Sequence, residues 1–170
     1  MSSYNLFNKE ITDWVKANFI KGSTCLDMGA GEGKYYDLLG DWLEMDAVEA
    51  FHPNIVTHNL ERRYRHVYCA DIRHFTYGFT TRPAYNLVIF GDVIEHMSVA
   101  EAQLVLAFAL SRSDDVLVAV PWRYKQGAIY GNPFEVHVQD DLTPQIFEER
   151  YHGFEPLFVN EQYGIYHKAP

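Results

Sequence analysis

The chain has 170 residues, of which 48% are hydrophobic and 15% aromatic, and its formal net charge at pH 7 is −9. This composition excludes a disordered chain, and the length suits one folding unit, so residues 1–170 are expected to form a single domain. The acidic balance argues against a broad basic surface for duplex nucleic acid. No apolar run approaches the roughly 18 residues of a membrane span, the N-terminus has no signal-peptide pattern, and two cysteines make no disulfide framework. We therefore expect a cytoplasmic protein without a membrane partner.

Helix-like and strand-like segments alternate along the first half of the chain. Apolar residues at helical spacing predict a helix over 7–19, and Gly22 is well placed to end it. The segments expected next are a strand over 24–28, a helix over 34–42, a strand over 46–50, a helix over 53–63 and a strand over 67–70.

The second half continues this alternation. A near-continuous apolar run over 85–90 predicts a strand in a sheet that is covered on both faces. Ser98 and Glu101 form a capping-box pattern that opens a helix to about residue 112. The remaining expected segments are a strand over 116–120 that Pro121 stops, a helix over 143–151, and two closely linked strands over 157–160 and 163–167. The whole pattern predicts an α/β fold with a doubly wound, mostly parallel sheet and a C-terminal antiparallel strand pair.

The most informative motif is the run Cys-Leu-Asp-Met-Gly-Ala-Gly-Glu-Gly over 25–33. It suits a buried strand that turns sharply into a helix, because each glycine allows a close approach of the backbone or a positive φ. A dinucleotide-binding fingerprint would need a glycine at position 34, where the chain has Lys34. Asp27 would repel a pyrophosphate and attract a ligand that carries a positive charge.

Acidic residues stand at or near the ends of four predicted strands, namely Asp27, Glu49, Asp71 and Asp92. In doubly wound sheets, ligands bind outside the carboxyl ends of the strands, near the switch point beside the first strand. Acids also cap helices, but four of them in register indicate one ligand site.

At this point the chain resembles the class I S-adenosylmethionine-dependent methyltransferases. Residues 26–33 resemble the first motif of that family, 48–51 the second, 71–72 the third and 86–96 the fourth, so the resemblance covers nearly the whole chain. It implies a Rossmann-like, seven-stranded sheet, S-adenosylmethionine as the cofactor and methyltransferase activity.

The resemblance also implies a role for each motif residue. Glu49 would accept hydrogen bonds from both ribose hydroxyls, Asp27 would help to hold the cationic amino-acid end, and Asp71 would accept from the adenine amino group. Ile72 and Phe51 would pack on the adenine ring, and Gly91 and Asp92 would line the methionine side. The full set of implied cofactor-binding positions is Asp27, Gly29, Ala30, Gly31, Glu49, Ala50, Phe51, Asp71, Ile72, Gly91 and Asp92.

The catalytic hypothesis centres on the pattern Asp-x-x-Glu-His over 92–96. It resembles the subgroup that contains ubiquinone-biosynthesis-type and many small-molecule O- and N-methyltransferases, which implies a small-molecule acceptor or an exposed group of a larger one. There His96, with Glu95 beside it, is a candidate general base, because the unperturbed pKa of histidine lies near neutrality. The alternative is that both side chains only shape the pocket or cap the next helix.

A second resemblance uses the same residues. An acid-x-x-Glu-His motif with a later histidine is similar to the metal site of small-RNA 3′-terminal 2′-O-methyltransferases, which implies that Asp92, Glu95, His96 and His137 hold a divalent ion. Two nitrogens and two oxygens suit Mn²⁺ or Zn²⁺ better than Mg²⁺. The family has Glu at the first position, where this chain has Asp, and this chain has no basic RNA-binding extension. A noncatalytic cofactor-binding module is a third possibility.

The irregular segment over 122–142 is long for a compact domain and is a candidate functional loop. Either it closes an aromatic wall over the acceptor, or its aromatic residues only pack on the sheet; Arg123 and Lys125 could meet an anionic group. The wall residues are Trp122, Tyr124, Tyr130, Phe134 and His137.

Two smaller expectations concern basic and sulfur-containing residues. The basic cluster over 62–66 is expected to be a solvated helix end entering a strand, with a binding patch as the alternative. Cys25 and Cys69 are expected to face the core, and the strand order of the resembled family would place them ~10 Å apart, too far to form a disulfide.

Overall fold

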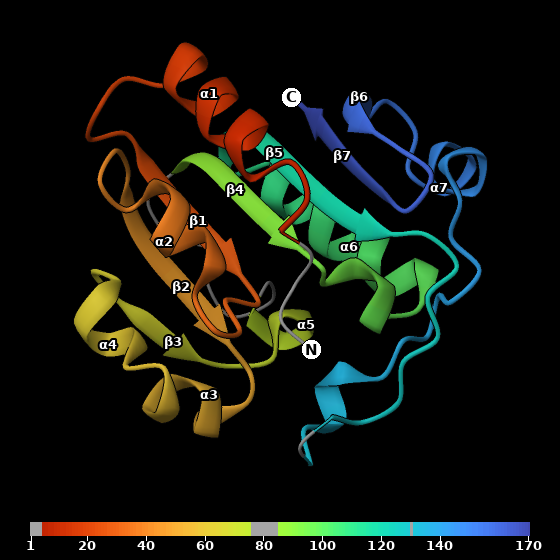
Figure 1. Cartoon of the computed structure of the whole chain (residues 1–170), viewed down its shortest axis with the longest axis horizontal. Coiled ribbons are helices and arrows are strands. Elements are labelled where there is room, and N and C mark those ends of the chain that lie inside the picture. Colours follow the sequence, from red (N-terminus) through yellow and green to blue (C-terminus); the bar gives the residue numbers. More distant parts are fainter. Residues whose placement is uncertain (1–4, 76–84, 130) are drawn as a thin grey trace.

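A seven-stranded sheet in the order β3-β2-β1-β4-β5-β7-β6 forms the centre of the computed structural model, which describes residues 5–75, 85–129 and 131–170 (Figure 1). The neighbours from β3 to β5 pair in parallel, and β7 pairs antiparallel with both β5 and β6. This arrangement confirms the predicted fold class. The strands are β1 (Thr24–Met28), β2 (Glu44–Glu49), β3 (Val67–Cys69), β4 (Tyr85–Gly91), β5 (Ser113–Pro121), β6 (Glu155–Val159) and β7 (Tyr163–Lys168).

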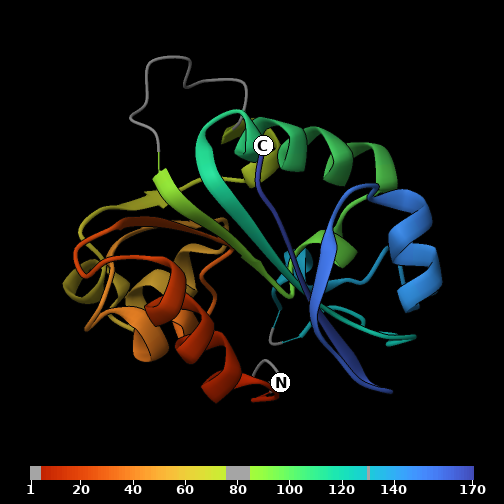
Figure 2. The ribbon, with the colours of Figure 1, turned by 90° about the horizontal axis from the view of Figure 1, so that it is seen from above.

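Helices cover both faces of the sheet (Figure 2). They are α1 (Asn8–Asn18), α2 (Lys34–Leu39), α3 (His52–Thr57), α4 (Leu60–Arg63), α5 (Ile72–Phe75), α6 (Val99–Leu110) and α7 (Pro144–Arg150), with the short 3₁₀ helices η1 (Ile94–His96) and η2 (Pro133–Glu135). Alternate strand residues point to opposite faces. In β4, Val88 and Phe90 join the core under α5, α6 and α7, whereas Leu87 and Ile89 join the core under α1, α2, α3 and α4. Both faces of β4 are therefore buried, as its apolar run predicts.

Some predicted helix boundaries differ from the observed ones. The helix predicted over 53–63 is two short helices, because Asn59 adopts a left-handed conformation with φ 51° and begins α4. α2 ends at Leu39, earlier than predicted, and α1 ends at Asn18, so Gly22 lies in the turn that follows it. The pattern did not predict α5, η1 or η2. The other predicted elements are present, with ends shifted by up to three residues, and the capping box of Ser98 and Glu101 is confirmed.

Two expectations about side chains need correction. Cys25 is buried as predicted, but Cys69 is exposed, because it ends β3, a three-residue strand at the edge of the sheet. The basic cluster is only in part a solvated helix end. Arg63 donates hydrogen bonds to the carbonyl oxygens of Glu32 and Gly33, and Arg65 forms an ion pair with buried Asp46. No helix among the described residues is both long enough and apolar enough to cross a membrane.

Candidate functional site

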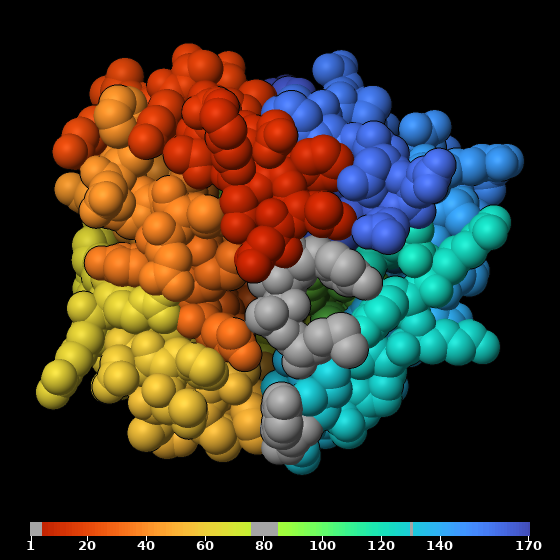
Figure 3. Space-filling model, in the orientation of Figure 1, coloured from red at the N-terminus to blue at the C-terminus, as the bar shows by residue number. Residues whose placement is uncertain are grey.

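A cleft lies at the carboxyl ends of the parallel strands and consists of two adjoining pockets. The Glu49 pocket, of about 890 Å³, is lined by the turn after β1, the ends of β2 and β3, and the segment 132–138. The Tyr124 pocket, of about 1020 Å³, is lined by the start of α2, the end of β4, η1 and the segment 121–137. In Figure 3 the cleft opens between the orange atoms of the β1–α2 region and the cyan atoms of the later loop. The two pockets share Gly29, Gly31, Asp92, His96, Asn132 and Glu135.

The turn after β1 brings bare backbone to the floor of both pockets. Gly29 and Gly31 have φ values of 84° and 54°, a region that side-chain-bearing residues rarely adopt. A Cβ on Gly29 would lie 2.5 Å from the Val93 Cγ2 atom, so only glycine fits against η1. The turn is tied to β2 because the Gly31 N–H donates to Glu49 Oε2 at 2.7 Å. The floor of the cleft is therefore held in one conformation.

Glu49 is fixed at the end of β2 by two backbone donors. Besides Gly31, the Phe51 N–H donates to Glu49 Oε1 at 2.7 Å. Burial raises the pKa of Glu49, and these hydrogen bonds oppose that shift. The Asn54 side chain also hydrogen-bonds this carboxylate, which still has lone-pair capacity to accept from a ligand hydroxyl.

All of the cofactor positions named from the sequence except Asp27 line the cleft. Phe51 lines the Tyr124 pocket and Ile72 the Glu49 pocket, so the two side chains expected to pack on one ring lie in different pockets. The Asp71 carboxylate already accepts hydrogen bonds from Arg73 Nε and from the Arg73 backbone N–H, each at 2.9 Å. Burial raises the pKa of Asp71, but the hydrogen bonds from Arg73 bring it below the usual value.

Asp27 lies beneath the glycine turn and is 1% exposed. Its Oδ2 atom accepts a hydrogen bond of 2.6 Å from the hydroxyl group of Tyr64, the residue that directly follows α4. Its Oδ1 atom has no hydrogen-bond partner among the described residues. Burial raises the pKa of Asp27 to about 7. This carboxyl group therefore titrates near neutral pH.

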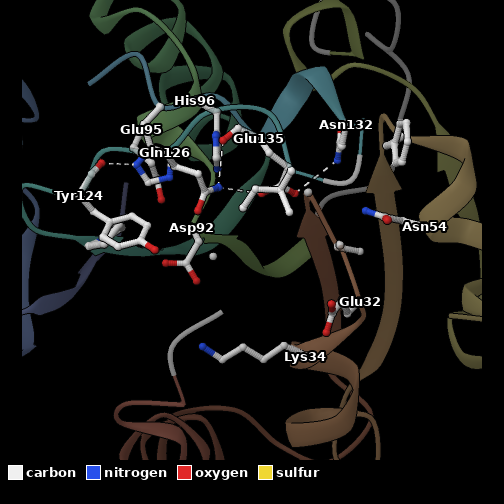
Figure 4. A pocket seen from close by; sticks show the side chains of 18 of the residues that line it. Glu32, Lys34, Asn54, Asp92, Glu95, His96, Tyr124, Gln126, Asn132 and Glu135 are labelled. Carbon is white, nitrogen blue, oxygen red and sulfur yellow. Dashed lines mark hydrogen bonds between the residues drawn. The ribbon is translucent and has the colours of Figure 1, made fainter. Parts of the chain in front are cut away.

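Asp92 follows β4 in a left-handed conformation, with φ 55°. Its Oδ1 atom accepts a hydrogen bond of 2.5 Å from the Tyr163 hydroxyl, whereas Oδ2 has no partner in the described part of the chain. Burial raises the pKa of Asp92 to about 6. Figure 4 shows Lys34 and Asp92 extending into the same pocket from opposite walls.

Glu95, His96 and His137 form a group in which ligand-type atoms of all three lie within 4.8 Å of one another. Figure 4 shows Glu95 and His96 on the wall above Asp92. Glu95 is 0% exposed, and within the described residues neither of its carboxylate oxygens has a hydrogen-bond partner. Burial raises the pKa of Glu95 well above its usual value. Of the four residues in the metal hypothesis, these three come together and Asp92 is not part of the group.

Both histidines are oriented by backbone carbonyls. His96 Nδ1 lies 3.3 Å from the Val136 carbonyl oxygen, and His137 Nδ1 lies 2.7 Å from the Tyr124 carbonyl oxygen. Burial lowers the pKa of both imidazoles, which favours neutral rings near pH 7. A neutral ring that donates through Nδ1 carries its lone pair on Nε2, the form that a general base or a metal ligand requires.

The later loop forms the outer wall of the cleft. The side-chain amides of Gln126 and Asn132 donate to the Glu135 carboxylate at 3.0 and 3.3 Å (Figure 4). The backbone N–H groups of Val138 and Gln139 donate to the Glu95 carbonyl oxygen, which fastens the loop to η1. An irregular segment is thus held against the site by long-range hydrogen bonds, which the local sequence pattern does not predict.

Only some of the aromatic residues expected to form a wall over the acceptor line the cleft. Tyr124 and His137 line the Tyr124 pocket and Phe134 lines the Glu49 pocket, but Trp122 packs on Phe147 and Tyr166 in the core. Tyr130 lies outside the described residues. Neither Arg123 nor Lys125 lines a pocket, and the Lys125 side chain is 86% exposed. The site residues that the sequence reasoning missed are Lys34, Tyr35, Tyr64, Gln126, Asn132 and Tyr163.

Comparison with known proteins supports the fold. No protein-family model and no curated protein matches the sequence. A S-adenosylmethionine-dependent methyltransferase from Clostridium acetobutylicum matches with a TM-score of 0.70 over 95% of this chain and 89% of its own, at 9% identity. A SAM-bound amino pentose methyltransferase from Micromonospora echinaspora, involved in calicheamicin biosynthesis, matches with a TM-score of 0.66 over 95% and 90%, at 12% identity. A TehB-like SAM-dependent methyltransferase from Corynebacterium glutamicum matches with a TM-score of 0.65 over 98% and 89%, at 12% identity. The chain therefore has the α/β fold of these methyltransferases.

Proposed function

We propose that the protein is a methyltransferase that uses S-adenosylmethionine and acts on an oxygen or nitrogen nucleophile. The acceptor is a small molecule or an exposed group of a larger one. The observation that carries this proposal is the cleft itself, which the glycine turn, Glu49, Asp92 and the neutral His96 all line. The fold neighbours support the same cofactor, since the amino pentose methyltransferase was solved with bound SAM.

The residues present fit this cofactor. The backbone at Gly29 and Gly31 lines both pockets without a side chain, and Glu49, which accepts from the Gly31 N–H, presents its carboxylate beside them. S-Adenosylmethionine supplies a methyl group that its sulfonium already activates. The protein then has to align the acceptor and to take up its proton. We assign the proton to His96 Nε2, because its Nδ1 hydrogen bond leaves that atom as the base.

The first test is calorimetric titration with S-adenosylmethionine and S-adenosylhomocysteine. Glu49→Gln should weaken both affinities about 10- to 100-fold, because a charge-assisted hydrogen bond contributes about 1.5–3 kcal/mol. Exposed Glu161 offers a matched control, and Glu161→Gln should bind like the wild type. If the wild type binds neither compound, the proposal fails. If it binds them but transfers no labelled methyl group to pools of small molecules or RNA, a noncatalytic module is the better description.

We propose a metal-dependent transferase as the second candidate, because of the group formed by Glu95, His96 and His137. Two imidazoles and one carboxylate with an open fourth position are a ligand set typical of catalytic zinc. The backbone hydrogen bonds at both Nδ1 atoms are the outer contacts that orient metal-binding histidines. A divalent ion held there would activate an acceptor hydroxyl. In this version the acceptor is the terminal ribose of an RNA, although the net charge of −9 favours a smaller substrate.

Chelation separates the two candidates. Under the second candidate, labelled methyl transfer disappears with a chelator and returns with Mn²⁺ or Zn²⁺, and His137→Ala loses calorimetric Mn²⁺ binding. Exposed His152 supplies the control, since His152→Ala should keep that binding. Undiminished transfer in the presence of chelator would rule out the metal-dependent version and leave His96 as the base.

A further inference from the structure

Lys34 has a place in the cleft that the proposed chemistry does not yet use. It is the first residue of α2, directly after the glycine turn, and its side chain extends into the Tyr124 pocket (Figure 4). Among the described residues it is the only lysine or arginine that lines this pocket. The ammonium group lies 5.3 Å from the centre of the Tyr35 ring and 5.9 Å from that of Tyr163, a geometry that stabilises a cation.

The polar groups near Lys34 are incompletely satisfied. Asp27 Oδ1, Asp92 Oδ2 and the Tyr35 hydroxyl are all buried and have no hydrogen-bond partner in the part of the chain that the structure describes. Buried polar atoms without a partner are rare, because each costs about 1–3 kcal/mol. Tyr35 packs against β4, where a Cβ on Gly91 would come within 2.8 Å of the tyrosine oxygen. Tyr35 and Asp92, which carry two of these unused oxygens, both line the Tyr124 pocket, whereas Asp27 lies beneath its floor.

We infer that Lys34 binds the α-carboxylate at the amino-acid end of the methyl donor. This inference rests on the proposed function. The amino-acid end carries one carboxylate and one ammonium group, and the pocket offers a matching set. Lys34 and the Tyr35 hydroxyl donate to the carboxylate, and Asp92 Oδ2 accepts from the ammonium.

The arrangement of the two pockets indicates that the carboxylate bound by Lys34 belongs to the methyl donor and not to the acceptor. The nucleoside part of the donor belongs in the Glu49 pocket, where Glu49 presents its carboxylate. Gly29 and Asp92 line both pockets, so a ligand that passes over them reaches Lys34 with its other end. The sulfonium then lies between the two ends, beside His96, which also lines both pockets. An acceptor enters from the wall that carries Glu95 and His96, opposite Lys34 (Figure 4).

Lys34 also has a structural role that the test must separate from ligand binding. Burial lowers its pKa, while the nearby carboxylates of Asp92 and Asp27 favour its charged form. A residue that only balances these two carboxylates would matter equally for every ligand of the cleft. A residue that binds the carboxylate matters only for ligands that have one.

The test compares S-adenosylhomocysteine with its decarboxylated form, which keeps the ammonium group and lacks the carboxylate. By calorimetry, the wild type should bind the intact compound about 10- to 100-fold more tightly, the range expected for a hydrogen bond to a charged group. Lys34→Met should lose that preference, with the affinity for the decarboxylated compound changed by less than about threefold. Lys34→Arg should keep most of it. Exposed Lys125, which lines neither pocket, provides the control, and Lys125→Met should bind both compounds like the wild type.

The outcomes distinguish this inference from the proposed function. If the wild type binds neither compound, the proposed function itself fails. If the wild type binds both equally, the inference is wrong whatever the variants do, and no variant has to fold for that result. Equal weakening of both compounds by Lys34→Met would assign the residue a structural role and would also overturn the inference.

Discussion

The two pockets of the cleft are built from different lengths of chain. The inner wall of the Glu49 pocket comes from successive turns after β1, β2 and β3, and Glu49 is held by backbone donors only 2 and 18 residues away. The Tyr124 pocket is assembled from segments that are distant in the sequence. The Tyr163 hydroxyl donates to Asp92 across 71 residues, and His96 Nδ1 lies within hydrogen-bond distance of the Val136 carbonyl oxygen, 40 residues away. A wall made of local turns can be predicted from a short sequence motif. A wall made of long-range contacts cannot, because its residues are scattered along the sequence without a common pattern.

This difference also suggests a division of work. If the Glu49 pocket holds the donor and the outer part of the Tyr124 pocket activates the acceptor, variants of the two should change different quantities. Changes at the glycine turn should weaken donor binding. Changes at His96 should slow turnover and leave donor binding intact.

The largest expected effect is on turnover. His96→Ala removes the proposed base and should lower kcat about 10²- to 10⁴-fold, the usual contribution of a general base. S-Adenosylhomocysteine affinity, measured by calorimetry, should change little. His152→Ala is the control for the loss of an imidazole from the protein. A large loss of donor affinity in His96→Ala would break the division between the two pockets.

The next effect is on donor binding and folding together. Gly29→Ala forces a Cβ to 2.5 Å from Val93 at a φ of 84°, so the turn must shift. We expect the affinity for S-adenosylhomocysteine to fall about 100-fold, and the free energy of unfolding in urea to fall by about 1–3 kcal/mol. Gly127 has open space around it and serves as the control. Normal donor affinity in Gly29→Ala would show that the turn does not contact the ligand.

The sequence predicted the architecture and the inner wall because both depend on local pattern. The alternation of apolar segments determines the doubly wound sheet, and the glycines at 29 and 31 occupy the turn expected of them. The acids at strand ends lie at one edge because parallel strands end together. Asn59 shows the limit of helical periodicity, since its positive φ divides a helix that the spacing alone would continue.

The rest of the site depends on contacts that no single segment specifies. The sequence around Asp92 does not predict the hydrogen bond from Tyr163, because β7 becomes a neighbour of β5 only in the folded sheet. The engagement of Asp71 by Arg73 depends on the helical turn of α5, which the sequence reasoning did not predict. Lys34 had a local signal, which is its position directly after the glycine turn. The sequence alone does not show that the folded chain places Asp92 and Tyr35 beside its ammonium group.

A smaller effect, on the pH dependence of binding, connects the two pockets through Asp92. The pKa values of about 6 for Asp92 and about 7 for Asp27 lie above the ordinary value of 3.8. An ammonium group is bound best by ionised carboxylates, so the affinity for S-adenosylhomocysteine should rise about tenfold or more between pH 5 and pH 8. Calorimetry across this range is the measurement. A flat profile would remove both carboxylates from ammonium binding.

The same shifts determine the sign of the stability change. The folded pKa values are raised, so these two groups stabilise the ligand-free protein fully below about pH 4, and this contribution is lost as pH rises through 6 and 7. Urea unfolding without ligand should therefore show a falling free energy of unfolding over this window. Asp92→Asn should make the fall shallower, because one of the two titrating carboxylates is gone.

The smallest effect tests the long-range contact that distinguishes the Tyr124 pocket. The Tyr163 hydroxyl donates to Asp92 and favours the ionised carboxylate, against the burial that raises its pKa. Tyr163→Phe should therefore move the rise in donor affinity to higher pH, with a loss of about threefold at pH 8, within the range for one hydrogen bond. Tyr166 is the matched control, because it lies on the same strand and its buried hydroxyl has no partner within the described residues. If Tyr166→Phe shifts the profile as much as Tyr163→Phe does, the shift comes from packing of β7 and not from the hydrogen bond to Asp92.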